Sequence, residues 1–202
     1  MEIEIIQKAV EILQNSDYLP EIIPEVRSNL VMARENSVET GDVAGIPGRI
    51  TIIKDRVKVF MKPDWGASSH MARLVLAVMA HDPERRSAMN IRYHPILIEI
   101  CEKLGLRISF YNREEEPKDI RKIEGGTIPW GVEQAIKRIG GVPDVIYHTG
   151  DWGKEPSIVL IGCDAVDVAK MAVCIAQLFH VRGGQSVLFV PSRKSYIEKK
   201  GP

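Results

Sequence analysis

The chain has 202 residues, of which 45% are hydrophobic and 27% charged, as in an ordinary globular domain. Lys plus Arg and Asp plus Glu both number 27, so the formal net charge is zero. This balance argues against broad binding to nucleic acid or to an anionic membrane. The most apolar run, 165–179, contains Asp167, Lys170 and Gln177, so it predicts a core helix and not a membrane span.

The cysteines and the N-terminus indicate a cytoplasmic protein. The three cysteines show no C-x-x-C spacing, and two of them lie in apolar segments, which favours buried free thiols in a reducing cytosol. The first residues, MEIEIIQKAV, are acidic and amphipathic and do not resemble a signal peptide.

Hydrophobic periodicity predicts a first helix over 3–15, which ends at the sequence NSDYLP. Because this helix is separable from the rest of the chain, we expect two parts: an N-terminal helix or linker, 1–18, and one main domain, 19–202. The domain begins with an extended segment at 28–33 and a turn-rich stretch at 40–49. Two β-branched runs around Lys54-Asp55-Arg56 then predict a hairpin at 50–60.

Helices and strands alternate in the remainder of the chain. We expect helices over 70–80, 94–105, 124–141 and 164–179, and strands over 89–93, 107–112, 144–150, 156–162 and 186–192. The sequence NREEEPKD between two of these elements predicts a charged surface loop. Together with the hairpin, this order predicts a layered α/β domain with a mixed sheet.

Polar loops at the junctions between elements are the candidate sites. In PDWGASSHMAR, Ser68 or Ser69 can cap the following helix, and its free N–H groups can hold an anion beside His70. In AGIPGRI, Gly48 permits a tight turn and Arg49 can bind a phosphate with two hydrogen bonds. Taken alone, each motif is better explained by a capped helix or a surface salt bridge.

A third loop, EGGTIPWG, opens a helix with Gly125, Gly126 and Thr127. Such an arrangement cradles phosphate through backbone N–H groups, with Thr127 as the predicted N-cap. Trp130 either stacks on a heteroaromatic ring or fills the core, and the sequence favours neither.

The fourth loop, TGDWGKEP, combines Asp151 with Lys154 and suits a metal–pyrophosphate group. A solvated connection between two strands explains it equally well. Polar groups near strand ends add Asn29, Asn90 and Arg92 to the candidates.

Several chemistries lack their motifs. No H-x-H pair, H-E-x-x-H motif or cysteine cluster is present, which argues against a zinc site. There is no G-x-S-x-G, so serine-hydrolase chemistry is not supported. The histidines at 81, 94, 148 and 180 occur singly, and we expect a surface or core position for each.

The segments IPEVRSNLVMA, VAGIPGRITI, KPDWGASSHMAR, MNIRY, EGGTIPWGVEQAI and PDVIYHTGDWGKEP, in this order, resemble the ThiN family of thiamine-phosphate synthases over residues 23–179. The resemblance implies a three-layer α/β/α fold with a mixed sheet, similar to class II aldolases of the AraD type without their zinc. It also implies that hydroxymethylpyrimidine diphosphate and hydroxyethylthiazole phosphate condense to thiamine phosphate and pyrophosphate.

The catalytic arginine and histidine of the family fall on Arg49 and His70. Mg²⁺ is implied as the cofactor that masks the diphosphate, with ligands that the sequence does not assign. Expected partners are the two small-molecule substrates, a second copy in a homodimer and a kinase within a longer kinase–synthase chain, but no nucleic acid or membrane. The candidates for substrate or phosphate binding are Asn29, Ser68, Ser69, Asn90, Arg92, Gly125, Gly126, Thr127, Trp130, Asp151 and Lys154.

Two rival functions compete with the synthase. ThiN-like domains also occur behind a DNA-binding helix-turn-helix as non-catalytic thiamine-phosphate sensors of transcriptional regulators. Residues 1–18 contain one helix, too little for that motif, and both Arg49 and His70 are retained, which favours the enzyme. An aldolase-like lyase rests on fold analogy alone and lacks the histidine pair.

Overall fold

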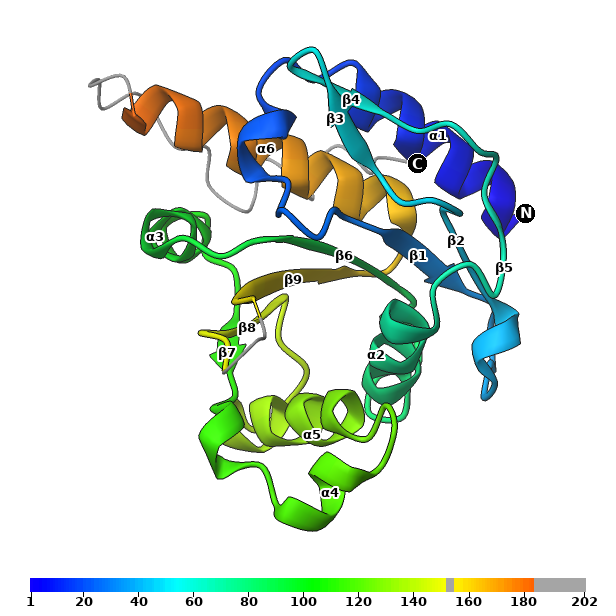
Figure 1. The fold of residues 1–202 in the computed structure, drawn as a ribbon, viewed down its shortest axis with the longest axis vertical. Helices are drawn as coiled ribbons and strands as arrows, with labels where there is room; N and C mark the ends of the chain where they lie inside the picture. Colours follow the sequence, from blue (N-terminus) through cyan, green and yellow to red (C-terminus); the bar gives the residue numbers. More distant parts are fainter. Residues whose placement is uncertain (152–154, 184–202) are drawn as a thin grey trace, which may run out of the picture.

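A computed structural model describes residues 1–151 and 155–183 (Figure 1). Seven strands form one sheet in the order β5-β2-β1-β6-β9-β8-β7, antiparallel throughout except for the parallel pair β7–β8. The strands of this sheet are β1 (Leu30–Ala33), β2 (Val43–Gly45), β5 (Asp64–Trp65), β6 (Ser87–Arg92), β7 (Ile108–Phe110), β8 (Val145–His148) and β9 (Ser157–Gly162).

The predicted hairpin is present as a separate two-stranded unit, β3 (Thr51–Ile53) and β4 (Arg56–Lys58). Its turn residues, Lys54 and Asp55, both have positive φ, of 48° and 58°. Two such residues form the two-residue turn whose twist suits an antiparallel hairpin.

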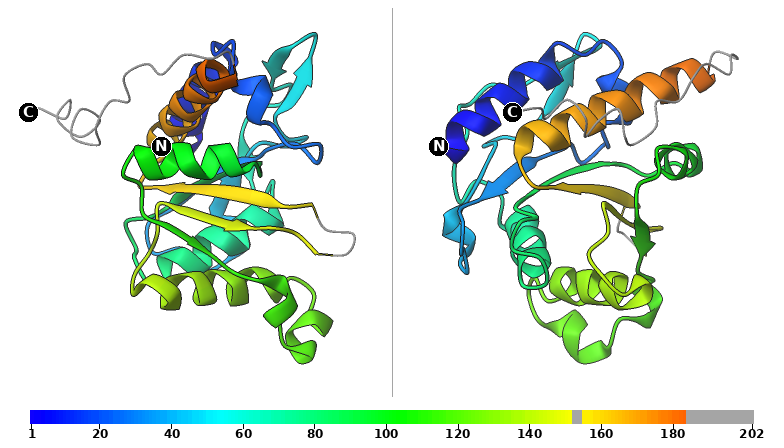
Figure 2. Two further views of the ribbon diagram at one scale, coloured as in Figure 1. Left: turned by 90° about the vertical axis from the view of Figure 1, so that its left-hand side faces the viewer. Right: turned by 180° about the vertical axis from the view of Figure 1, so that it is seen from behind.

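Helices cover both faces of the sheet, which confirms the predicted three-layer α/β fold with a mixed sheet (Figures 1 and 2). The α-helices are α1 (Glu2–Gln14), α2 (Ser69–Met79), α3 (Pro95–Lys103), α4 (Lys118–Lys122), α5 (Thr127–Ile139) and α6 (Ala165–Gly183). Short 3-10 segments are η1 (Leu19–Ile22), η2 (Thr40–Asp42) and η3 (Arg113–Glu115). Helices α1 and α6 lie on one face, and α2 and α5 lie on the other.

The sequence of β1, an interior strand of the sheet, is an unbroken apolar run because both of its faces are buried. Leu30 and Met32 are buried in the core shared with α1 and α6, whereas Val31 and Ala33 are buried in the core shared with α2 and α5. Successive side chains of a strand point to opposite faces, so a sheet covered on both sides needs apolar residues at every position.

The predicted N-terminal helix is confirmed as α1, and it belongs to the main core. Ile6, Ala9, Val10 and Leu13 are buried on its inner face, and the helix lies along α6 (Figure 2). The boundary after residue 18 stays a prediction about how the chain is organised.

Three local differences from the sequence predictions arise from short or mixed segments. Strands β2 and β5 lie within stretches that we expected to be loops, because strands of three and two residues give too little alternation to detect. The expected charged surface loop at 112–119 instead contains η3 and the start of α4, and Glu116 in it is buried. The strand expected at 186–192 lies outside the described residues.

Other expectations concern cysteines and membrane spans. Cys101 and Cys174 are buried free thiols, whereas Cys163 is exposed. Burial raises the pKa of Cys101 to about 12. In the described part of the chain, no helix combines the length and the apolar character that a membrane crossing requires.

Candidate functional site

The N-terminal ends of α2 and α5 lie together on one face of the sheet. Gly125, just before α5, packs against the side chain of Arg73 in α2. At the other end of the pair, His81 after α2 bonds Glu133 of α5, so the two helices run in the same direction. Both positive dipole ends therefore point to the same region, which favours an anion there.

Gly125 is required where it meets Arg73. Its φ is +76°, and a Cβ added to it would lie 2.5 Å from the Nε of Arg73. An L residue would therefore be strained and would also displace the guanidinium. Within the described residues, the Nε atoms of Arg73 and Arg113 are buried and have no hydrogen-bond partner. Buried unpaired donors of this kind are rare and need an explanation, and a bound anion would supply one.

His70 and Arg73 are three residues apart on α2 and so lie on one face of the helix. The ends of the parallel strands β7 and β8 contribute further groups, because strands that run the same way end at the same edge. His148 ends β8 and Tyr111 directly follows β7, and their ring centroids are 5.2 Å apart.

His148, the last residue of β8, lies near His70 at the start of α2. Burial, together with the nearby charges of Arg113 and His70, lowers the pKa of His148 to about 4, and burial is the largest cause. His70 and Arg113 are thus close enough to His148 to act on its charge. The Nδ1 atom of His148 accepts a hydrogen bond of 3.2 Å from the backbone N–H of Gly150.

Tyr111 is buried beside His148. Its pKa is raised to about 12, mainly because it is buried. A Cβ on Gly131 would meet its ring at 2.7 Å, and Trp130 contacts it edge to face at 6.0 Å between centroids. Trp130 also packs against the core of α2 and α5. Stacking of Trp130 on a ligand ring remains a prediction.

A buried carboxylate, Glu116, organises the start of α5. Its side chain is 1% exposed and lies 3.7 Å from the Nη2 of Arg113 and 3.8 Å from the Nε of Arg121. The hydroxyl of Thr127 donates to it over 2.5 Å. The prediction that Thr127 is the N-cap was therefore wrong. Gly126 occupies that position, and the buried carboxylate takes the hydroxyl because it needs donors.

Asn29 and Asn90 hold the second part of the site together. The Asn29 side chain accepts from the N–H of Ile46 over 2.9 Å and donates to its C=O over 3.0 Å. Asn90 accepts from the N–H of Asn29 over 2.8 Å and donates to the C=O of Arg27 over 3.1 Å. These bonds give both amides a positioning role, and a direct contact with substrate stays a prediction.

Arg49 belongs to this second part of the site, and its backbone has the left-handed conformation. Its φ is +66°, and the φ of Arg27 is +71°. The two arginines precede the paired residues Ser28 and Ile50 on neighbouring segments. Left-handed conformations in residues other than glycine cost energy and cluster at functional sites. The Nη1 of Arg49, which is exposed, donates to the C=O of Val26 over 2.5 Å.

The loops of Arg49 and His70 are linked through Gly45. A Cβ at Gly45 would lie 3.3 Å from the Asn29 side-chain oxygen and 3.7 Å from Ala67, three residues before His70. The same asparagine holds Ile46, whose C=O accepts from the N–H of Arg49. The convergence of Arg49 and His70 on one ligand stays a prediction, and this common support favours it.

Five candidates remain, and four of them lie in the part of the chain that the structure describes. Ser68 occupies the N-cap position of α2, but its hydroxyl makes no capping bond there, and Ser69 is the first helical residue. Arg92 donates to the C=O of Glu21 in η1 over 3.1 Å. Asp151 lies 3.5 Å from Arg121 at the rim. Lys154 lies outside the described residues.

Sequence reasoning missed Arg73, Tyr111, Arg113 and His148. The histidine had been expected at an isolated surface or core position, yet it faces the same region as His70. The available signal was that it ends one predicted strand while Tyr111 follows another, and two parallel neighbours would bring these ends together.

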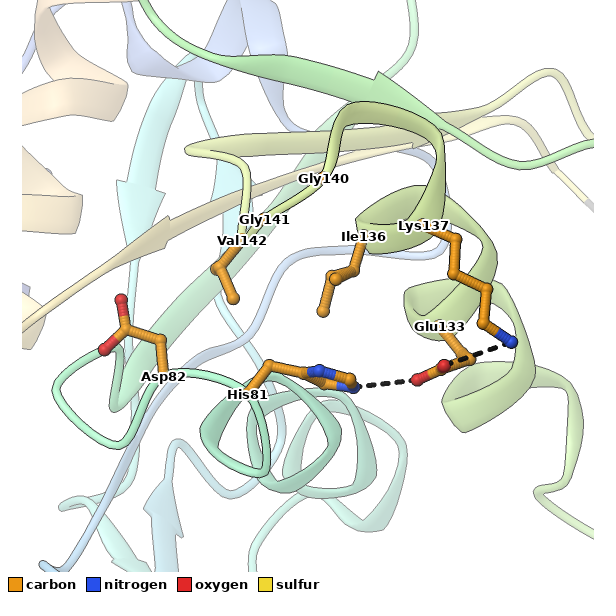
Figure 3. A pocket seen from close by; sticks show the side chains of 8 residues that line it. All are labelled: His81, Asp82, Glu133, Ile136, Lys137, Gly140, Gly141 and Val142. Atoms are coloured by element: carbon orange, nitrogen blue, oxygen red, sulfur yellow. Dashed lines mark hydrogen bonds and ion pairs between the residues drawn. The ribbon is translucent and has the colours of Figure 1, made fainter.

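A separate pocket of about 460 Å³ lies at the opposite ends of α2 and α5 (Figure 3). In it Glu133 accepts from His81 over 2.7 Å and pairs with Lys137 at 3.2 Å. Lys137 and then His81 lower the pKa of Glu133. Since Glu133 is already paired with both His81 and Lys137, we assign no ligand to this pocket.

The chain has a three-layer α/β fold on which two helix ends and several arginines converge, an arrangement that favours a phosphorylated ligand. The sequence profile described as "Thiamine-phosphate synthase ThiN" matches residues 6–173. The chain therefore belongs to the ThiN family.

Individual relatives agree with the family. "Thiamine-phosphate synthase ThiN" of Methanothermobacter thermautotrophicus is 50% identical over 179 residues, which are 89% of this chain and 94% of that protein. "Bifunctional thiamine biosynthesis protein ThiDN" of Methanocaldococcus jannaschii is 36% identical over 162 residues, 79% of this chain and 37% of that longer protein.

A solved structure shares the fold. The C-terminal domain of a phosphomethylpyrimidine kinase aligns with a TM-score of 0.79 and 43% identity, over 85% of this chain and 97% of the domain. A sugar-phosphate aldolase from Thermotoga maritima aligns over 92% of this chain and 97% of its own, with a TM-score of 0.45 and 11% identity. We draw no functional conclusion from that second likeness.

Proposed function

We propose that this chain is a thiamine-phosphate synthase that condenses hydroxymethylpyrimidine diphosphate with hydroxyethylthiazole phosphate. The observation that carries the proposal is the 50% identity to a thiamine-phosphate synthase over 89% of the chain. The family resemblance implies the catalytic roles that we propose for Arg49 and His70. The relatives are named as a thiamine-phosphate synthase, a bifunctional thiamine biosynthesis protein and the C-terminal domain of a phosphomethylpyrimidine kinase. None of these names favours the alternative of a regulatory sensor.

The reaction separates charge at one carbon. The bond from the pyrimidine methylene carbon to the diphosphate oxygen breaks, and its electron pair leaves with the diphosphate. The lone pair of the thiazole nitrogen then forms the new C–N bond. No proton is needed at the reacting carbon, so catalysis depends on positioning the substrates and on stabilising the departing diphosphate.

The geometry supplies groups for that stabilisation. The N-termini of α2 and α5, the guanidinium groups of Arg73 and Arg113, and His70 all border one region. We assign the phosphate oxygens to this region and Arg49 to the substrate from the neighbouring loop. Positive groups fixed by the fold need no rearrangement when negative charge develops on the leaving group.

Mg²⁺ is proposed to enter with the diphosphate. Within residues 1–151 and 155–183, no three His, Cys, Asp or Glu side chains form a metal-binding group. Mg²⁺ commonly keeps several waters and binds through one or two carboxylates plus substrate phosphates. Asp151 at the rim fits such a ligand, and the bound ion would neutralise diphosphate charge. Removing Mg²⁺ with a chelator should abolish activity, and adding it back should restore it.

The direct test is to incubate the purified chain with both substrates and Mg²⁺, without ATP, and to measure thiamine phosphate. Product should form because the diphosphate ester already carries the leaving group. Tight binding of thiamine phosphate without any product from authentic substrates would instead support the sensor.

Three further proposals concern the compartment of the protein, its fusion to a kinase and its oligomeric state. The cytoplasm is its expected compartment, and a kinase fusion is favoured by the ThiDN relative, whose name states two functions. A homodimer would cover the exposed Phe60 and Met61, which follow the β3–β4 hairpin. Sedimentation of the wild type and of Phe60→Asp tests the dimer: the variant should be monomeric, and a wild-type monomer would refute it.

A further inference from the structure

His148 is placed to reach a ligand between β8 and the start of α2. It is the last residue of β8, it is half-buried, and its ring lies 5.2 Å from that of Tyr111. His70 and Arg113 both act on its charge, from α2 and from η3. The ring therefore stands among the groups assigned to the phosphate oxygens.

The hydrogen bond from Gly150 fixes which ring nitrogen carries the proton. Because Nδ1 accepts the N–H of Gly150 over 3.2 Å, the proton of the neutral ring is on Nε2. Nε2 is the nitrogen farther from the main chain, so the donor is at the outer end of the side chain. Imidazole in this form donates from Nε2 and cannot accept there.

The charges around the ring favour an anionic acceptor. With a pKa of about 4, His148 is neutral near pH 7 and does not repel the guanidinium of Arg113. Tyr111 has a pKa raised to about 12, so it adds no negative charge. A donor beside Arg113, whose buried Nε has no partner in the described part of the chain, complements a phosphoryl oxygen.

We propose that His148 is a further substrate-binding residue, whose Nε2–H donates a hydrogen bond to a phosphoryl oxygen held between His70 and Arg113. This proposal rests on the proposed function. The oxygen belongs either to the diphosphate of the pyrimidine or to the phosphate of the thiazole, since both present the same acceptor. The role is distinct from that of His70, because His148 acts as a fixed neutral donor.

The test uses variants that separate the donor at Nε2 from the local hydrogen bond with Gly150. In His148→Gln the amide N–H₂ reaches the position of Nε2, whereas in His148→Asn the side chain can accept from Gly150 but cannot reach that position. His148→Phe keeps the ring beside Tyr111 and removes both nitrogens. His94→Phe is the matched control, because the Nδ1 of His94 also accepts from an N–H two residues ahead over 3.2 Å, while its ring packs against Phe179.

We expect His148→Asn and His148→Phe to lower kcat/KM by roughly 10- to 100-fold, the loss typical of a hydrogen bond to a charged group. His148→Gln should stay within about threefold of the wild type, and His94→Phe within about twofold. KM for each substrate and calorimetric binding of inorganic pyrophosphate and of thiazole phosphate identify the acceptor. If the variants bind pyrophosphate more weakly, the acceptor oxygen belongs to the diphosphate. If they bind thiazole phosphate more weakly, it belongs to the phosphate of the thiazole.

Wild-type activity in His148→Phe, or equal losses in His148→Gln and His148→Asn with unchanged melting temperatures, would overturn the proposal. An equal loss in His94→Phe would also overturn it, because the effect would then be structural. If the wild type makes no thiamine phosphate, the proposed function fails by itself. Pyrophosphate binding to the same variants then decides whether His148 contacts phosphate.

Discussion

Replacing Gly125 by alanine should separate backbone strain from displacement of Arg73. The left-handed backbone at φ +76° costs an alanine about 1–2 kcal/mol. The new Cβ would also lie 2.5 Å from the Arg73 Nε, against an ordinary contact of 3.4–4 Å, so the guanidinium must move by roughly 1 Å. Misplacement of that size can reduce turnover about 100-fold.

Gly140 provides the matched control. It follows α5 in the left-handed conformation, with φ +69°, and a Cβ there would meet nothing within 4 Å. Gly140→Ala should therefore carry the same backbone cost without moving a side chain at the site. For a chain of this length, either change should lower the melting temperature by roughly 2–8 °C.

The assay compares kcat/KM and melting temperature for the two variants. We expect Gly125→Ala to lose about 10- to 100-fold in kcat/KM, and Gly140→Ala to stay within about twofold of the wild type. Similar activities at similar melting temperatures would show that the contact between Gly125 and Arg73 does not position a catalytic or binding group.

Three other predictions test the rest of the structure. Arg49→Ala should lower kcat by about 10²–10³-fold with little change in melting temperature. The control Arg34→Ala removes an arginine that is stacked on a tryptophan outside the site, and it should leave kcat unchanged. Equal kcat values for the two variants would exclude Arg49 from catalysis. Because burial lowers the pKa of His148 to about 4, the unfolded state binds its proton first as pH falls from about 6.5. The stability that depends on the neutral His148 is complete above about pH 6.5 and is lost toward pH 4. The melting temperature of His148→Phe should therefore depend less on pH between about 6.5 and 4 than that of the wild type. An identical pH dependence would contradict the lowered pKa of His148. Ile6→Ala should cost about 2–5 kcal/mol in denaturant unfolding, and Ile3→Ala, at a partly buried position, should cost less; a negligible cost at Ile6 would show that α1 is dispensable to the core.

Elements with strong local patterns were predictable from the sequence. Apolar spacing in α2 and α5 and alternation of β-branched residues in the β3–β4 hairpin depend on neighbours in the chain, which the sequence displays. The short strands β2 and β5 were missed because they gain their order from pairing with distant residues.

The residues of the candidate site also differ in whether their signal is local or depends on distant parts of the chain. Arg49 and His70 were named through the family resemblance, and the loops that carry them had the expected small and polar residues. His148 could not be placed, because only the parallel pairing of β7 with β8 brings its end of the sheet to Tyr111. Glu116 was expected in solvent because of its charge, and its burial depends on arginines at 113 and 121.

The packing of α1 against α6 has a consequence for folding during synthesis. Both helices lie in one layer, yet α6 begins at Ala165, so the part of α1 that packs on α6 stays uncovered in the nascent chain until that segment leaves the ribosome. At roughly 5–20 residues per second this interval is on the order of 10 s. Helix α1 is therefore made well before its contacts with α6 can form, and its uncovered face is the surface a chaperone would cover in the meantime.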